Sequence, residues 1–250
     1  LYVVDSRQSH SLSQTFAILE KLGAMKPGEA IHLDYGFVSF KGSVLSSRKG
    51  NMVLLEDLLQ EAEEKVGKII EEKNPGLSAR GGSAFGGKNI EFIVKAIAKA
   101  ALKYFDLKHN RHSDIEFSWD DVLDFEGDSG PYLQYAYARL ASILRRAEFP
   151  ISNFQFPMNV SISNTERELL FKLSILPEIV EDAVQEYLPN ILANYLYNLA
   201  TLVNKFYHES PVIAEKDEQV KNFRLGLIMR AKDTLGQGLN LLGIEALEEM

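Results

Sequence analysis

A short polar segment after the second predicted strand carries the residue types that hold a polyphosphate. Within six positions it offers two hydroxyls, two cations, a glycine and an amide: Ser46, Ser47, Arg48, Lys49, Gly50 and Asn51. Hydroxyl and backbone donors bind phosphate oxygens closely, and the cations neutralise their charge. A solvated hairpin tip explains the composition equally well. The position favours a ligand site, because ligands of open α/β sheets bind beyond the carboxyl ends of strands.

The residues that follow the first predicted strand form a second candidate site. Gln8 offers both a donor and an acceptor, and Asp5 can bind a cation such as a guanidinium. Because both come directly after Tyr2–Val4, the same rule for strand ends places them near a ligand. The alternative is an ordinary start of a helix, capped by Asp5 or Ser6.

A glycine-rich run nearly matches a phosphate-binding loop. Gly82–Asn89 fits the pattern G-x-x-x-x-G-K, with Lys88 as the cation. However, Asn89 stands where the loop needs a hydroxyl for Mg²⁺, and Leu77–Arg80 is not the strand that should precede it. We favour a flexible linker, and a nucleotide-binding protein that uses this loop stays a rival interpretation.

Tyrosines and arginines cluster in the second half of the chain. One predicted helix carries Tyr132, Tyr135 and Tyr137 and then Arg139, Arg145 and Arg146, and Tyr207 ends another helix. Aromatic rings and guanidinium planes are the surfaces on which the bases of single-stranded RNA stack. The alternative is that most of these rings pack the core. We expect this of Tyr135, whereas Tyr207 fits either role.

Other reactive pairs favour structural roles. His109 and His112 have a metal-ligand spacing but no third ligand nearby, so no metal site is predicted. Asp120–Asp121 is typical of a turn and a helix start, and no Ser-His-Asp arrangement with an elbow motif occurs. The sequence has no cysteine, which excludes disulfides, thiol catalysis and cysteine-held zinc.

Charge and composition limit the partners. Of the 250 residues, 46% are apolar and 25% charged, as in soluble globular proteins, and no apolar run approaches the ~18 residues of a membrane span. Residues 1–118 hold 16 Lys and Arg against 15 Asp and Glu, whereas residues 119–250 hold 11 against 20. The second half is therefore too acidic for unspecific polyanion binding, although local basic spots can still bind a folded RNA.

The elements that must position these residues change in type near residue 118. Before it, strands are predicted at 2–4 and 31–35, and helices at about 11–22, 56–72 and from Asn89 onward. After it, the pattern predicts only helices: one after Pro131, one from a capping box at Ser163–Glu166 that breaks at Pro177, one from Pro189 and one over about 217–242. The sequence thus predicts part of an α/β domain followed by an α-helical bundle.

Four stretches, in this order, resemble arginyl-tRNA synthetases in their carboxyl-terminal part. They are Tyr2–Gln8, Leu45–Asn51, Phe125–Ala136 and Leu241–Glu245. The run Gly-Pro-Tyr-Leu-Gln-Tyr-Ala that begins at Gly130 is the most specific of them. The resemblance implies a class I enzyme that activates L-arginine with ATP and attaches it to tRNA(Arg). It further implies that residues 1–118 are the second half of a Rossmann-like catalytic domain and residues 119–250 a helical anticodon-binding domain.

The same resemblance assigns roles to residues. It implies ATP-binding by Ser46, Ser47, Arg48, Lys49 and Gly50 as a KMSKS-type loop, catalysis by Arg48 and Lys49, substrate binding by Gln8 and Asp5, and tRNA binding by Tyr132, Arg139, Tyr207 and Met250. Catalysis in such a loop is electrostatic positioning at the α-phosphate. The implied cofactors are ATP and Mg²⁺, with no metal held by the protein itself.

Two departures from the family pattern limit what the chain does alone. In Val44–Arg48, Ser47 replaces the second lysine of KMSKS, so Arg48 or Lys49 must supply its charge. No HIGH-type sequence occurs, and the chain opens inside a strand without an initiator Met and without a secretory signal. We therefore expect a piece of a longer, cytoplasmic, monomeric enzyme that does not aminoacylate by itself. A stand-alone RNA-binding helical module without catalysis is the rival.

Overall fold

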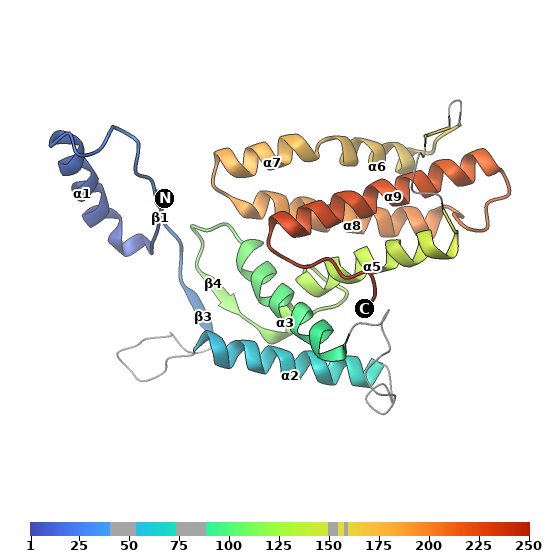
Figure 1. Ribbon diagram of the computed structural model, residues 1–250, viewed down its shortest axis with the longest axis horizontal. Coiled ribbons are helices and arrows are strands. Elements are labelled where there is room, and N and C mark those ends of the chain that lie inside the picture. The colour runs from blue at the N-terminus through green and yellow to red at the C-terminus, as the bar shows by residue number, and fades with distance from the viewer. Residues whose placement is uncertain (41–53, 74–88, 150–154, 158–159) are drawn as a thin grey trace.

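The computed structural model describes residues 1–40, 54–73, 89–149, 155–157 and 160–250 (Figure 1). The amino-terminal part contains β1 (Tyr2–Val3), a 3₁₀ turn η1 (Ser6–Gln8), α1 (Ser9–Lys21), β2 (His32–Leu33), β3 (Val38–Phe40), α2 (Leu55–Lys73), α3 (Ile90–Leu107) and β4 (Ile115–Phe117). The part that follows contains α4 (Trp119–Val122), α5 (Gly130–Arg146), α6 (Asn164–Ser174), α7 (Leu176–Gln185), α8 (Pro189–Glu209) and α9 (Glu218–Leu241). The predicted order of an α/β part followed by helices is confirmed.

The helix boundaries are where the capping residues of the sequence place them. The Asn89 side chain accepts a hydrogen bond from the Glu91 backbone at the start of α3, as expected. Ser163 and Glu166 form the predicted reciprocal capping box of α6. Pro177 lies in the first turn of α7, so the helix restarts there instead of continuing from α6. These local signals were sufficient to position most of the helices.

The strands are shorter and more numerous than predicted. β1 and β2 pair in parallel over two residues, so the prediction of a strand over 31–35 is wrong in length. The chain leaves the strand at Asp34, whose side chain and backbone oxygens both accept hydrogen bonds from Arg111. A second parallel pair, β3 with β4, was not predicted, because each strand has three residues and shows too little alternation to detect.

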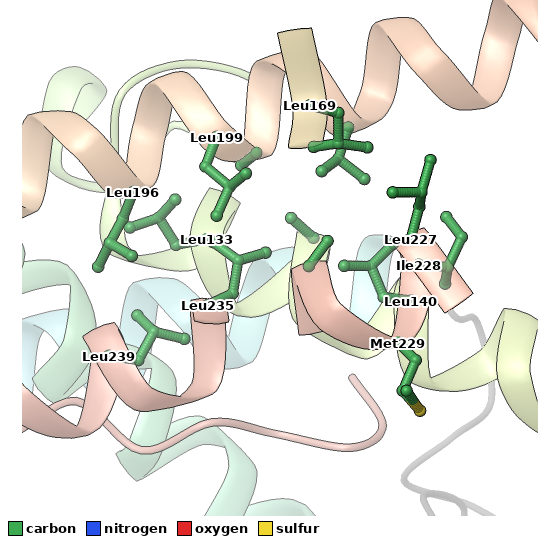
Figure 2. Packing of buried hydrophobic residues seen from close by; sticks show 14 of the residues in the cluster. Leu133, Leu140, Leu169, Leu196, Leu199, Leu227, Ile228, Met229, Leu235 and Leu239 are labelled. Carbon is green, nitrogen blue, oxygen red and sulfur yellow. The ribbon is translucent and has the colours of Figure 1, made fainter. Parts of the chain in front are cut away.

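The main core lies in the helical half of the molecule. Figure 2 shows leucines of α5, α6, α8 and α9 pointing toward one another: Leu133, Leu140, Leu169, Leu196, Leu199, Leu227, Leu235 and Leu239. All are buried, and burial of a side chain of this size contributes about 2 kcal/mol each. The helices are therefore held by a continuous apolar interior, which fixes the surfaces that they present.

A second core cluster lies between α2, α3, α4 and β4. It includes Ile97 and Phe117 and also takes in Leu247 from the end of the chain. α3 contributes to both clusters, because Tyr104 on it belongs to the main core. The second cluster therefore joins residues from both sides of position 118, and the predicted division into domains 1–118 and 119–250 stays a prediction.

The first 40 residues add no buried side chain to either cluster, although Phe40 packs against the second one with its ring 4.7 Å from the Phe117 ring. All of them are described, and none is buried. In Figure 1 the unit of β1 and α1 extends away from the bundle at one end of the molecule. Tyr2 and Phe16 stack with their ring centroids 5.0 Å apart, so the unit has internal contacts but no interior of its own.

Candidate functional site

One face of α5 carries the polar residues that the RNA hypothesis singled out. Tyr135, Arg139, Ser142 and Arg146 follow one another at intervals of four, three and four residues, which places them on a single side of the helix. The prediction that Tyr135 packs in the core is wrong: 49% of this residue is exposed. The core stripe of α5 runs through Leu133, Ala136, Leu140 and Leu144, and Tyr135 lies beside that stripe.

A cavity of about 460 Å³ lies against this face. Its lining comes from α5, from the last turns of α8 and from the end of the chain: Tyr135, Arg139, Arg146, Tyr207, Glu249 and Met250 are among its residues. Three of the four residues predicted to bind tRNA, Arg139, Tyr207 and Met250, therefore meet in one place. Tyr135 was missed, and the signal that could have found it is its helical spacing from Arg139.

Arg139 and Tyr207 form the centre of this cavity. The guanidinium carbon of Arg139 lies 5.0 Å from the centroid of the Tyr207 ring, a cation–π arrangement. The Arg139 guanidinium also lies 3.5 Å from the side-chain oxygen of Asn204, which it approaches as a donor. The guanidinium thus covers one face of the Tyr207 ring, and the guanidinium plane is the surface that suits a nucleobase.

Tyr132, the fourth predicted residue, supports the site from within. It is only 9% exposed, and its ring packs against Tyr197 with the centroids 5.6 Å apart. Its hydroxyl accepts a hydrogen bond from the Asn204 amide at 2.8 Å. Because core side chains cover the ring, it offers no face on which a base can stack. Its contact to Asn204 instead links the core to the residue beside Arg139.

The charges at the cavity are locally basic although this half of the chain is acidic. Arg145 is paired with Glu249 at 3.1 Å and lies 3.6 Å from a carboxylate oxygen of Glu248. Arg146 is exposed and forms no ion pair with any residue that the structure describes. An unpaired cation next to the exposed Tyr135 ring is the local combination that single-stranded RNA requires.

The predicted catalytic edge is only partly described. Ser46, Ser47, Arg48, Lys49 and Gly50 lie outside the described residues, as does the glycine-rich run up to Lys88. The hypotheses for these two loops therefore stay predictions. Of this edge, the structure describes the residues around β1 and β2, which include Asp5 and Gln8.

Asp5 binds a guanidinium of the chain itself. It caps η1 by accepting from the Arg7 backbone, and its two carboxylate oxygens accept from Nε and Nη2 of Arg7 at 3.1 and 2.9 Å. The hydrogen bond from Arg7 lowers the pKa of Asp5, so the carboxylate is charged at neutral pH. Gln8 is exposed on the same turn. Asp5 therefore has the geometry predicted for binding a guanidinium, although a neighbouring residue occupies it here.

A second cavity, of about 480 Å³, opens at the carboxyl end of β2. Asp34, Phe37, Arg111 and Tyr187 contribute to its mostly apolar lining, whereas Asp5 and Gln8 do not. Burial raises the pKa of Asp34, but hydrogen bonds from Arg111 and His112 outweigh that effect and lower it. Asp34 is thus fixed as a charged partner of Arg111.

Metal-ligand groups and membrane-spanning helices were sought in the part of the chain that the structure describes. There, no three His, Asp or Glu side chains are grouped as metal ligands. His109 bonds to the Phe105 carbonyl, and His112 to the Asp34 carboxylate, so the two rings have separate partners. None of the helices described has both the length and the apolarity of a membrane span.

Comparison with known protein families divides the chain in two. Residues 1–119 match the family model of the class I (R) tRNA synthetase catalytic domain. Residues 133–250 match that of the DALR anticodon binding domain. The cavity formed by α5, α8 and the end of the chain lies within the second match.

Individual relatives agree with both family models. The chain is 36% identical to the arginine–tRNA ligase of Alkaliphilus metalliredigens and 39% identical to that of Vibrio parahaemolyticus, in each case over 100% of this chain and 42% of the relative. The solved arginyl-tRNA synthetase of Thermus thermophilus superposes with a TM-score of 0.83 at 34% identity, over 99% of this chain and 40% of that one. The chain thus spans about two fifths of the length of these relatives. It belongs to the arginyl-tRNA synthetase family, of which it represents the carboxyl-terminal region.

Proposed function

We propose that the cavity at Tyr135, Arg139 and Tyr207 binds the anticodon loop of tRNA(Arg). The observation that carries this proposal is the Arg139 guanidinium held over the Tyr207 ring, inside the region that matches the anticodon-binding family model. Unpaired bases of the loop would stack on the exposed Tyr135 ring and on the guanidinium plane. Arg146, exposed at the end of the same face, would neutralise a phosphate.

The amino-terminal part has a complementary role in this proposal. Residues 1–118 would contribute one side of the catalytic domain, with Arg48 and Lys49 neutralising the phosphates of ATP and Ser46, Ser47 and Gly50 closing around them. Mg²⁺ would arrive with ATP. Gln8 and Asp5 would face L-arginine, and the bidentate pair between Asp5 and Arg7 supports the affinity of Asp5 for a guanidinium. Substrate would then have to displace Arg7.

An RNA-binding experiment tests the first part. Arg139→Ala should weaken binding of an anticodon stem-loop of tRNA(Arg) by about tenfold, since a cation–π contact is worth about 0.5–2 kcal/mol. Arg167→Ala is the matched control, because Arg167 is an exposed arginine on α6 away from the cavity. The readout is the dissociation constant by fluorescence anisotropy. Equal losses for both variants, or indifference to changed anticodon bases, would refute the proposal.

An activity measurement tests the second part. Arginine-dependent exchange of pyrophosphate into ATP should be absent with this chain alone, because it spans 42% of its relatives. A longer chain that also includes the part of the relatives that these 250 residues do not cover should support exchange. In that longer enzyme, replacing both Arg48 and Lys49 by alanine should lower the rate of activation. Exchange by the 250-residue chain itself contradicts the proposed division of labour.

A further inference from the structure

The last residues of the chain form a segment, here called the tail (residues 243–250), that folds back along α5. Gly243, at a positive φ of 67°, turns the chain after α9. Gln134 of α5 donates a side-chain hydrogen bond to the Glu245 carbonyl at 2.8 Å. Leu247 is fully buried in the cluster of α2 and α3. Backbone and apolar contacts thus hold the first half of the tail.

Beyond Leu247 the tail is held by polar contacts centred on Glu248. Its carboxylate lies 2.7 Å from the Lys232 ammonium on α9 and accepts a hydrogen bond from the Tyr137 hydroxyl at 3.0 Å. Arg145 donates to its backbone carbonyl at 3.2 Å and lies 3.6 Å from its second carboxylate oxygen. Glu248 therefore connects the tail to two helices through three side chains.

The residues after Glu248 reach the proposed RNA cavity. Glu249 contacts Arg145 at 3.1 Å, and Met250 lines the cavity together with Arg139 and Tyr207. The position of Met250 therefore depends on how the tail is fastened two residues earlier. Releasing Glu248 would free Met250, and it would free Arg145 from two of its three tail contacts.

We propose that Glu248 is a positioning residue for RNA binding. It fastens the tail across α5 and α9 and thereby completes the wall of the cavity at Met250. This inference rests on the proposed function, because it assumes that the cavity receives RNA. It adds a residue that acts on RNA through the surface it holds in place, so tail docking and RNA binding favour each other.

The proposal predicts that removing the Glu248 charge changes RNA affinity in the direction opposite to that expected from charge repulsion alone. Glu248 lines the cavity as a negative charge, and removing such a charge should strengthen binding of a polyanion through weaker repulsion. If Glu248 acts by positioning, the same change should weaken binding, because the wall of the cavity loosens. The sign of the change therefore separates the two roles.

The test compares two charge-removing variants of the 250-residue chain. Glu248→Gln should weaken binding of the anticodon stem-loop by about threefold to tenfold, the loss expected when a partly exposed charged contact is broken. Glu148→Gln is the matched control, since Glu148 is an exposed carboxylate near the end of α5 that forms no ion pair with a described residue. Binding by Glu148→Gln should be unchanged or slightly tighter.

A second readout follows the tail without RNA. Because the chain has no cysteine, Leu247→Cys introduces a single thiol at a buried tail position. Its rate of reaction with a thiol reagent measures how often the tail opens. Adding Glu248→Gln should raise that rate about fivefold, as loss of ~1 kcal/mol of local stability implies. Adding Glu148→Gln should not change it.

Each outcome decides between the two proposals. Weaker RNA binding by Glu248→Gln together with faster thiol reaction supports the positioning role. Unchanged or tighter binding by Glu248→Gln, while Arg139→Ala weakens it, overturns the positioning role and leaves the proposed function intact. Unchanged binding by Arg139→Ala removes the proposed function, and the positioning role for RNA fails with it. An unchanged thiol rate also overturns the inference, because the tail would not depend on Glu248.

Discussion

The helical half and the first 40 residues carry chemically suggestive side chains on very different supports. In α5 alone, eleven residues are buried, and the polar face at Tyr135 and Arg139 is fixed by the core behind it. In residues 1–40, all of which are described, no residue is buried, although Asp5 and Gln8 lie there. A polar site can thus be held in place by a buried core in one part of a chain and lack such a core in another.

The distribution of exposed apolar side chains also differs between the first 40 residues and the helical half. Among the residues that the structure describes, half of the exposed large hydrophobic ones lie within the first 38 positions: Leu1, Tyr2, Val3, Ile18, Leu22, Tyr35, Phe37 and Val38. A concentration of this kind is typical of a face that another folded surface covers. The helical half needs no such cover for its core, so we expect the two parts to respond differently to the same kind of mutation.

The largest difference should appear between two ion pairs. In the helical half, Arg224 on α9 binds Glu166 of α6 at 2.8 Å, and the Glu166 side chain is 2% exposed. Arg224→Met would leave this carboxylate buried without its cation, at a cost of about 3–5 kcal/mol. Arg7→Ala breaks the pair with Asp5, but the Arg7 side chain is 71% exposed, so no measurable loss of stability is expected.

Urea unfolding followed by far-UV circular dichroism measures both changes. Adding Glu166→Gln to Arg224→Met should recover part of the stability, because the amide is neutral and can still accept from the Ser163 backbone. Equal effects of Arg224→Met and Arg7→Ala would break the comparison. Failure of Glu166→Gln to restore any stability would show that the buried charge is not the cause.

The sequence predicts well those features that depend on local signals. The capping box of Ser163 and Glu166, the cap at Asn89 and the start of α8 at Pro189 each involve residues close together in the chain. The three residues Arg139, Tyr207 and Met250 were selected by family resemblance and by residue type, and the structure brings them to one cavity. Resemblance supplied long-range information that local patterns lack, and the RNA-binding role of the three residues stays a prediction.

Features that depend on long-range packing could not be predicted. Val38 of β3 pairs with Ile115 of β4, 77 positions later, and this pairing has no local signature. The exposure of Tyr135 depends on which face of α5 meets α9, and the burial of Tyr132 on Tyr197 and Asn204 of another helix. The role of Glu248 likewise requires Lys232, Tyr137 and Arg145, which meet only in the folded chain.

A smaller effect on stability is expected where the two parts meet, at the contact between α3 and α5. Gly130 begins α5 so close to α3 that a Cβ atom would lie 2.3 Å from the Ala100 carbonyl oxygen. Gly130→Ala should therefore separate the helices and cost about 2 kcal/mol. Gly67→Ala in α2 is the control of opposite sign: its Cβ would meet nothing within 4 Å, so helix propensity should add about 0.5–1 kcal/mol. Thermal unfolding distinguishes them, and stabilisation by both would contradict the close packing at Gly130.

The smallest effect concerns the pH dependence of the tail. Burial alone would raise the pKa of Glu248, but hydrogen bonds from Lys232 and Tyr137 and the charges of Lys232 and Arg145 lower it below the ordinary 4.5. A carboxylate with a lowered pKa adds stability above its unfolded-state value and loses that contribution as pH falls through its folded-state value. Because the Glu248 side chain is 52% exposed, screening limits the contribution to about 1 kcal/mol. The melting temperature of Glu248→Gln should therefore lie slightly below that of the unchanged chain at neutral pH, and the gap should close below pH 4.5, since the amide cannot titrate.

A difference in melting temperature that stays constant with pH would mean that the Glu248 charge does not hold the tail. The fastening would then belong to Leu247 and the Gln134 hydrogen bond, and the surface at Met250 would be as firmly supported as the helix face opposite it.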